Sequence, residues 1–167
     1  MLKKQFLYLI IFLLVPTVVL GAVLIISTKD VSDDNPVDQF MVGNAFYLKG
    51  DYESALVHFE RAAELDPDYE AALNNLAFCY NRLGRFEDAA GALARLAEID
   101  PKNPSYHYDL GVNIMLSIQQ DNKGTIEEVE AALESFRQAE SLNPGFEHAK
   151  ENINFTEDLA RQYYGQQ

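Results

Sequence analysis

The residues of this chain that could carry out chemistry are few, and their spacing matches no catalytic or metal-binding pattern. The sequence has one cysteine, Cys79, which excludes an intrachain disulfide and a cysteine-cluster zinc site. The three histidines, His58, His107 and His148, lie far apart and form no HExxH motif. The glycines form no phosphate-binding loop, and no Ser–His–Asp set or carboxylate pair stands out. We therefore predict no enzymatic activity, no metal and no cofactor, which leaves surface recognition as the function.

The charge of the chain narrows the class of partner. The sequence has 26 acidic and 13 basic residues, and its formal net charge is −13. Lys3 and Lys4 are the only charged residues before Lys29, so the negative charge belongs to the remainder of the chain. A strongly acidic domain repels nucleic-acid phosphates, which predicts that the partner is not a nucleic acid. The acidity either provides solubility or forms an acidic docking face.

An apolar segment near the N-terminus predicts a membrane anchor. Residues 6–26 (FLYLIIFLLVPTVVLGAVLII) carry no charge, and 21 residues in a helix span about 30 Å, the thickness of a bilayer hydrocarbon core. The alternative is a cleavable signal peptide that begins with Lys3 and Lys4. However, the apolar run is longer than such a peptide needs, and it continues beyond a cut at Gly21. We therefore expect an uncleaved, single-pass signal-anchor.

The charges that flank this anchor predict its orientation. Lys3 and Lys4 precede it, whereas acidic residues dominate the stretch behind it, and positive flanks tend to stay in the cytoplasm. We expect a cytoplasmic N-terminus at 1–5 and a polar linker at 27–36. The domain that follows should then be extracytoplasmic, and periplasmic if the source is a bacterium.

A repeated pattern of small, large and proline residues occupies most of the remaining chain. Pro67 and Pro101 are 34 residues apart, and the residues before each proline recur at matching offsets. A third and longer copy ends at Pro144. The copies consist of Gly43, Phe46, Gly50, Ala55, Phe59, Ala62 and Pro67; of Ala77, Tyr80, Gly84, Ala89, Leu93, Leu96 and Pro101; and of Gly111, Ile114, Gly124, Ala132, Phe136, Ala139 and Pro144.

This pattern resembles the tetratricopeptide repeat (TPR) family. The resemblance implies an all-α fold in which each unit is a pair of antiparallel helices and the units stack into a solenoid. The three implied units span 37–69, 70–103 and 104–145, and a capping helix with a short tail occupies 146–167. The expected helices are 37–49, 53–65, 70–83, 87–99, 105–120, 126–142 and 146–163.

The repeated residues have an expected role inside each unit. Small residues let the two helices approach closely, as Gly43 would do against Ala55. Large residues fill the space alongside, as Phe46 would do with Phe59. The glycine after the first helix, Gly50 in the first unit, suits the turn between the two helices.

The third unit is longer than the first two. Gly111 and Gly124 are thirteen residues apart where the first two units have seven, and the second helix gains about three residues. The extra residues lie near 117–128, where Thr125 and Glu128 form a capping-box pattern that predicts the start of a helix. The insertion is either a tolerated loop or a protruding contact element.

In the TPR family, the first helix of each unit lines a concave groove that binds a partner. Mapped by spacing, the resemblance places asparagine, aromatic, apolar and arginine side chains there. Asparagine amides can bond to a peptide backbone, and aromatic rings supply apolar area. The residues so placed are Phe40, Asn44 and Tyr47 in the first unit; Asn74, Asn75, Phe78, Asn81 and Arg82 in the second; and Tyr108, Val112 and Met115 in the third.

One binding mode of the family does not fit this sequence. Some chaperone-binding members hold the C-terminal carboxylate of a peptide with two asparagines and several basic residues. Asn44 and Asn75 match the asparagine positions, but Phe40, Ser105 and Asp109 stand at the basic positions. A terminal carboxylate would be repelled by Asp109, so we do not expect this mode here.

Two functions are compatible with these observations. The first is a membrane-tethered adaptor or assembly factor, a scaffold that binds a partner protein through the groove. The alternative is a structural accessory subunit of a larger membrane protein complex. Tethering raises the effective concentration of the groove near the membrane, so a weak affinity for the partner suffices.

Overall fold

The computed structural model describes residues 35–122, 124–146 and 148–165. The predicted N-terminus at 1–5, the predicted anchor at 6–26 and nearly all of the linker lie outside these residues. Within the described ranges, no helix combines the length and the apolar character needed to cross a membrane.

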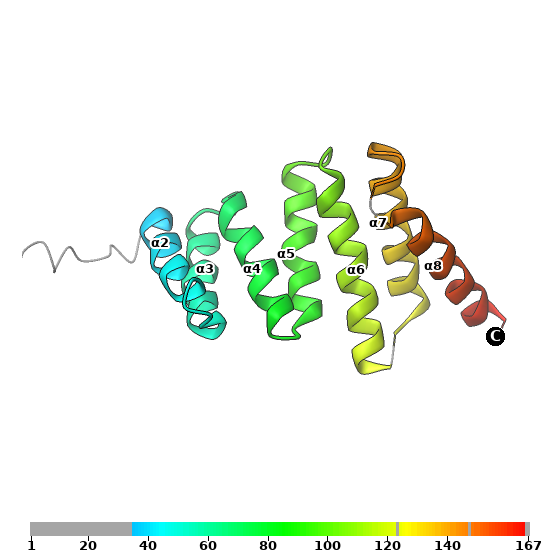
Figure 1. Cartoon of the computed structure of the whole chain (residues 1–167), viewed down its shortest axis with the longest axis horizontal. Helices are drawn as coiled ribbons and strands as arrows, with labels where there is room; N and C mark the ends of the chain where they lie inside the picture. Colours follow the sequence, from blue (N-terminus) through cyan, green and yellow to red (C-terminus); the bar gives the residue numbers. More distant parts are fainter. Residues whose placement is uncertain (1–34, 123, 147, 166–167) are drawn as a thin grey trace, which may run out of the picture. The chain divides into compact units, whose positions relative to one another are not determined.

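Seven α-helices make up the described part of the chain, and they confirm the all-α prediction. Each helix packs against the next one along the chain, which gives the pairs α2/α3, α4/α5 and α6/α7 followed by α8 (Figure 1). This is the array of helix pairs that the repeat pattern predicts. The bounds are α2 (Pro36–Tyr47), α3 (Tyr52–Leu65), α4 (Glu70–Arg82), α5 (Phe86–Ile99), α6 (Pro104–Asp121), α7 (Ile126–Leu142) and α8 (Ala149–Tyr164).

Capping side chains set where several helices begin. Asn35, Asp51 and Asn103 accept hydrogen bonds from backbone amides in the first turns of α2, α3 and α6. The predicted capping box is present at the start of α7. There the Glu128 amide donates to Thr125 Oγ1 at 3.2 Å, and the Thr125 amide donates to the Glu128 carboxylate at 2.7 Å.

The turns inside the helix pairs need a left-handed backbone conformation. Gly50 (φ 77°) and Gly84 (φ 71°) provide it after α2 and α4, where most side chains would be disfavoured. The aligned Gly124 does not have this role, because Asn122 (φ 50°) ends α6 in the left-handed conformation. Gly124 instead lies against the side chain of Ile118, which occupies the space that a Cβ would need.

The insertion in the third unit lengthens both of its helices. α6 has 18 residues where α4 has 13, and α7 has 17 where α5 has 14. Most of the added sequence is therefore helical and does not form a loop. The result is a long α6 whose last turns extend beyond the length of the first helices in the other two units.

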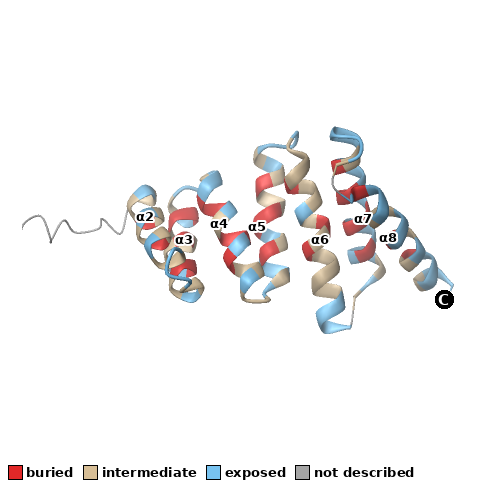
Figure 2. Cartoon of the chain, viewed as in Figure 1, coloured by how far each residue is buried: buried red, intermediate tan, exposed pale blue. Residues whose placement is uncertain are grey.

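Buried residues, coloured red in Figure 2, lie along the faces where the helices meet. The close approach in the first pair differs from the expectation, because the nearest side chain to Gly43 is Phe59 and not Ala55. The Phe59 ring lies 2.6 Å from the position of a Cβ on Gly43. The third unit repeats the arrangement, with the Phe136 ring 2.8 Å from the corresponding point on Gly111. In these two units the glycine of the first helix has no side chain, and this leaves room for the phenylalanine ring of the second helix. A phenylalanine needs more space than the alanine that we expected to face the glycine.

The aromatic side chains of α2 also pack differently from the expectation. Phe46 stacks on His58, with 5.5 Å between the ring centroids. It is Phe40, which we predicted for the groove, that lies beside the buried ring of Phe59 at 5.6 Å. Phe40 also contacts Tyr69 at 5.1 Å. The structure thus gives Phe40 a core contact between α2, α3 and the start of α4.

Candidate functional site

The structure brings the central predicted groove residues together in an aromatic cluster, formed by Tyr47, Tyr52 and Phe78. The rings of Tyr47 in α2 and Phe78 in α4 meet edge to face, with centroids 5.3 Å apart. Tyr52, at the start of α3, contacts both rings at 6.0 Å, and the Arg82 guanidinium lies 5.5 Å over the Tyr52 ring. Phe78 nevertheless stays 43% exposed, so its ring is held in place but open to a partner.

A cleft between α4 and α6 adjoins this cluster. Its volume is about 300 Å³, at the lower end of the range for ligand sites. Four predicted groove residues line it, namely Asn74, Phe78, Asn81 and Val112. The other lining residues, which the groove prediction did not include, are Ala77, Leu93, Asp109 and Asn113.

The predicted asparagines are engaged with neighbouring helices. Asn75 donates to Asn44 Oδ1 at 2.9 Å, which joins α4 to α2. Asn81 donates to Asn113 Oδ1 at 2.8 Å, which joins α4 to α6. Asn113 is buried and donates in turn to the backbone carbonyl of Asp109 at 2.9 Å. Because an amide side chain has two N–H donors and an oxygen with two lone pairs, these bonds use only part of the capacity of each asparagine.

Asn74 is held through a tyrosine and a carboxylate. Its amide donates to Tyr106 Oη at 3.3 Å, and the Tyr106 hydroxyl donates to the Glu70 carboxylate. Burial, and then the hydrogen bond to Glu70, raise the pKa of Tyr106, so its hydroxyl stays protonated and keeps donating. This chain of hydrogen bonds fixes the Asn74 amide at the edge of the α4–α6 cleft.

Tyr108 lies away from the aromatic cluster. Its ring contacts Phe136 at 5.8 Å and Phe146 at 5.7 Å, and its hydroxyl accepts a hydrogen bond from Asn152 of α8 at 3.3 Å. Val112 lines both the α4–α6 cleft and a second cleft to which Tyr108 belongs. The predicted groove residues therefore divide between two sites along the array.

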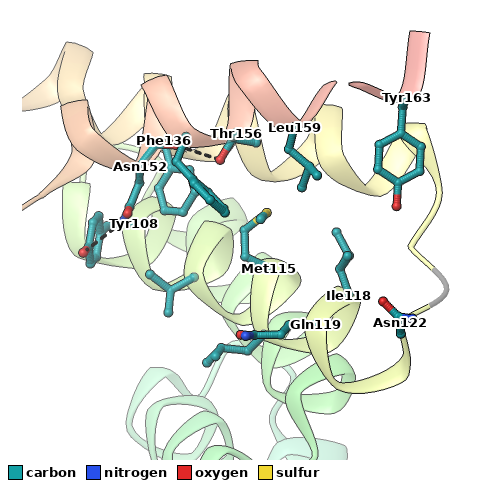
Figure 3. Close-up of a pocket in the computed structure, with 13 residues that line it drawn as sticks. Tyr108, Met115, Ile118, Gln119, Asn122, Phe136, Asn152, Thr156, Leu159 and Tyr163 are labelled. Atoms are coloured by element: carbon teal, nitrogen blue, oxygen red, sulfur yellow. Dashed lines mark hydrogen bonds between the residues drawn. The ribbon is translucent and has the colours of Figure 1, made fainter. Parts of the chain in front are cut away.

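The second cleft lies between α6 and α8. The predicted groove residues Tyr108, Val112 and Met115 line it, whereas the contribution of α8 was not predicted. The volume of the cleft is about 540 Å³, well within the range for ligand sites. Figure 3 shows Met115 and Ile118 of α6 and Leu159 of α8 facing the same space, with Tyr108 near one end and Tyr163 near the other. The remaining lining residues are Leu116, Gln119, Asn122, Phe136, Asn152, Phe155 and Thr156.

A signal for this second cleft is present in the sequence. Phe155 follows Pro144 by eleven residues, and Phe78 follows Pro67 by the same number. Phe155, an exposed aromatic residue of α8, thus stands at the same offset as Phe78, the exposed aromatic residue of α4. By this register α8 corresponds to the first helix of a further unit, although we expected it only to cap the third.

Comparison with known proteins supports the repeat pattern. Residues 46–110 match the family model described as tetratricopeptide repeat. Hsp70-Hsp90 organizing protein 1 of Glycine max is 46% identical over 46 residues, which are 28% of this chain and 8% of that protein. The chain thus spans only a small part of the length of this curated relative.

Solved structures share the arrangement of helices. A structure of MamA AMB-1 superposes with a TM-score of 0.63 at 21% identity, covering 78% of this chain and 67% of that chain. The first TPR of Spaghetti (RPAP3), solved bound to the HSP90 peptide SRMEEVD, superposes with a TM-score of 0.58 at 16% identity. It covers 78% of this chain and 97% of that chain. At these identities the likeness shows the fold alone.

Proposed function

We propose that this chain binds a peptide segment of a partner protein at the aromatic cluster and the adjoining α4–α6 cleft, and the match of residues 46–110 to the tetratricopeptide repeat family model supports this proposal. The observation that carries this proposal is that Phe78 is 43% exposed although two rings hold it in place. Aromatic anchors of this kind dominate binding at protein interfaces, and little side-chain entropy is lost when their position is already fixed.

The segment that binds here should be internal to the partner and not its C-terminal end. Asn75 donates to Asn44, and Phe40 is partly buried and packs against the core. The other two positions that would need a cation hold Ser105 and Asp109. A terminal carboxylate would meet the charge of Asp109 without a basic side chain at these positions to offset it. The site differs in this respect from one that binds an acidic C-terminal peptide.

We further propose that residues 6–26 anchor this binding domain to a membrane as an uncleaved helix. The uncharged run of 21 residues supports this, and the basic Lys3 and Lys4 support a cytoplasmic N-terminus with the domain on the other side. The chain would then act as an adaptor or assembly factor, without catalysis, that holds a partner beside the membrane. N-terminal sequencing of the purified protein tests the anchor, because a chain that begins at Ala22 or later would have lost it.

Site-specific photo-crosslinking in cells tests the binding surface. A benzophenone amino acid at position 78 should give a discrete adduct with one partner, and the same substitution at Val112 should capture the same protein. Val57 is the matched control, because it is an apolar residue of α3 with 64% exposure that lines neither cleft. Adducts from position 57 with none from position 78 would show that the partner uses another face.

The crosslinked segment of the partner then serves as a synthetic peptide for affinity measurements on the full chain. We expect Phe78→Ala to weaken its binding about tenfold or more, which is about 1.4 kcal/mol. The melting temperature should change little, because Phe78 is 43% exposed and does not belong to the buried core. Equal affinities of the wild type and Phe78→Ala would contradict the assignment of the site, and a large fall in melting temperature would assign Phe78 to the core.

A further inference from the structure

The outer face of α2 carries a stripe of apolar side chains, formed by Val37, Met41, Ala45 and Leu48. Val37, Met41 and Leu48 are 49%, 56% and 82% exposed, and Ala45 is exposed as well. Because a helix has about 3.6 residues per turn, these four residues share one face, opposite the buried Gln39 that bonds to α3. Among the described helices, α2 packs chiefly against α3, so the α2 stripe is left uncovered by them.

The two ends of the described array differ in the character of their outer faces. The terminal elements of a repeat array need a polar outer face in water. At the end formed by α8 (Figure 1), the exposed residues include Lys150, Glu151, Asp158 and Arg161. In contrast, α2 has a single charged residue, Asp38, which is half-buried. The α2 end of the array thus presents to water the kind of surface that other helices cover elsewhere in the array.

The sequence before α2 indicates which apolar phase is available to cover the stripe. The uncharged run of residues 6–26 ends ten positions before Pro36, where α2 begins. A chain of this length spans at most about 35 Å when it is fully extended. If the run crosses a bilayer, as we proposed above, then the first residue of α2 stays within that distance of the hydrocarbon core.

The area of the stripe argues against a second copy of the chain as its occupant. α2 has 12 residues, so its outer face is about 18 Å long and about 10 Å wide, or about 200 Å². A stable protein interface needs about 800 Å² on each partner. A bilayer surface has no such requirement here, because the tether holds α2 beside it at a high effective concentration.

We propose that the α2 stripe docks the array on the bilayer that holds the anchor, with its side chains in the headgroup region. The stripe binds phospholipid by apolar contact and not by charge, because α2 has no Lys or Arg to attract an anionic headgroup. This inference rests on the membrane anchor of the proposed function, and it is independent of the proposed peptide site.

Quenching of a fluorescent label by spin-labelled lipid tests the docking. The full chain, with Cys79→Ala to remove the native thiol, is placed at one chain per phosphatidylcholine nanodisc that contains lipids with a TEMPO headgroup. A bimane label on Ala45→Cys reports on the stripe, and a label on Asn154→Cys, at an exposed position of α8, is the reference. We expect about half or more of the fluorescence to be lost at position 45, and little at position 154.

Two further variants identify the stripe as the cause. Met41→Glu places a charge in the stripe and should lower the quenching at position 45 to the level at position 154. Val57→Glu is the matched control, because Val57 is an apolar residue of α3 with 64% exposure outside the stripe, and this change should leave the quenching as it was. The melting temperature of each labelled chain verifies that it is folded.

The outcomes that contradict the docking are distinct from failure of the proposed function. A chain that does not co-elute with nanodiscs would remove the anchor and the docking together. An incorporated chain with equal quenching at positions 45 and 154, or with equal effects of Met41→Glu and Val57→Glu, would overturn the docking alone. Quenching that needs phosphatidylglycerol would assign it to charge, and protection of the label only at two chains per nanodisc would assign the stripe to a second copy.

Discussion

At the scale of single residues, the fit between a small residue and a large one decides how closely the helices of a pair approach. Gly43 faces Phe59 and Gly111 faces Phe136. In the middle unit the corresponding residues are Ala77 and Leu93, which line the same cleft. Where the residue of the second helix is phenylalanine, the facing residue of the first helix is glycine. Where the residue of the second helix is leucine, the corresponding residue of the first helix is alanine.

The first prediction follows from this fit. Gly43→Ala gains about 0.5–1 kcal/mol in helix propensity, but its Cβ would lie 2.6 Å from the buried Phe59 ring, and overpacking of this kind costs ~1–3 kcal/mol. We therefore expect a net loss of stability in urea unfolding. Gly91→Ala is the matched control, because no atom lies within 4 Å of its Cβ position, and this variant should be unchanged or more stable.

A double substitution tests whether contact with the Phe59 ring causes the loss of stability in Gly43→Ala. Gly43→Ala with Phe59→Leu recreates the pairing of the middle unit, so the two changes together should cost less than the sum of the single costs. We expect a coupling free energy of ~0.5–3 kcal/mol in the double-mutant cycle. Strict additivity would mean that Phe59 is not what limits the side chain at position 43.

The sequence predicted which positions are equivalent among the units, because a spacing of 34 residues repeats them. It did not predict which residues face each other across a pair. Spacing suggested Gly43 with Ala55 and Phe46 with Phe59, whereas Phe46 stacks on His58. Facing partners depend on the angle and rotation between two helices, and one repeated pattern is compatible with several such geometries.

The buried thiol of Cys79 gives a prediction that depends on pH. Burial raises the pKa of Cys79 from its ordinary value of 9.0 to about 11, so the folded state keeps a proton that the unfolded state releases between these values. The free energy of unfolding should therefore fall as the pH rises through this window, by up to about 1.4 kcal/mol per pH unit. Cys79→Ala lacks this contribution, and its stability should fall less steeply over the same range.

At the scale of helices, the residue that ends the first helix differs between the third unit and the other two. Gly50 and Gly84 end the first helices of the other units, whereas Asn122 has the left-handed conformation after the longer α6. Asparagine tolerates this conformation better than other residues with a side chain, because its short amide bonds locally.

This difference gives a prediction for Asn122. Asn122→Ala places an ordinary side chain in the left-handed conformation and should cost ~1–2 kcal/mol in urea unfolding. Asn122→Gly should cost much less, since glycine is the residue that most readily adopts a positive φ. If both variants lose the same stability, then Asn122 stabilises the end of α6 through its amide side chain and not through its backbone conformation.

The helices themselves were largely predictable. The expected helix at 105–120 is α6, Pro104–Asp121, and the expected helix at 126–142 is α7, Ile126–Leu142. Proline, capping residues and apolar periodicity mark such boundaries locally. The contribution of α8 to the second cleft was missed, because a capping helix and the first helix of a repeat have the same pattern of apolar residues on one face.

At the scale of the whole described array, asparagine side chains connect one helix pair to the next. Asn75 bonds to Asn44, Asn81 bonds to Asn113, and Asn152 bonds to Tyr108. In a repeat array, stability is the sum of the units and of the interfaces between neighbours. These bonds belong to the interfaces, so they affect how cooperatively the units unfold.

The Asn81–Asn113 bond gives the prediction at this scale. Asn81→Ala would leave the buried Oδ1 of Asn113 without its donor, which should cost ~1–3 kcal/mol. The urea transition should also broaden, since the third unit is less tightly coupled to the second. Asn154→Ala, at an exposed position of α8, is the control and should stay within about 0.5 kcal/mol of the wild type.

α8 packs chiefly against a single described helix, α7. The free energy of a local opening scales with the contacts that must be broken, so the backbone amides of α8 should exchange with deuterium faster than those of α4, which has packed helices on both sides. Each opening also changes the separation of α8 from α6. A ligand held between these two helices would then reveal itself first as slowed deuterium uptake in α8, before any change in the exchange of α4.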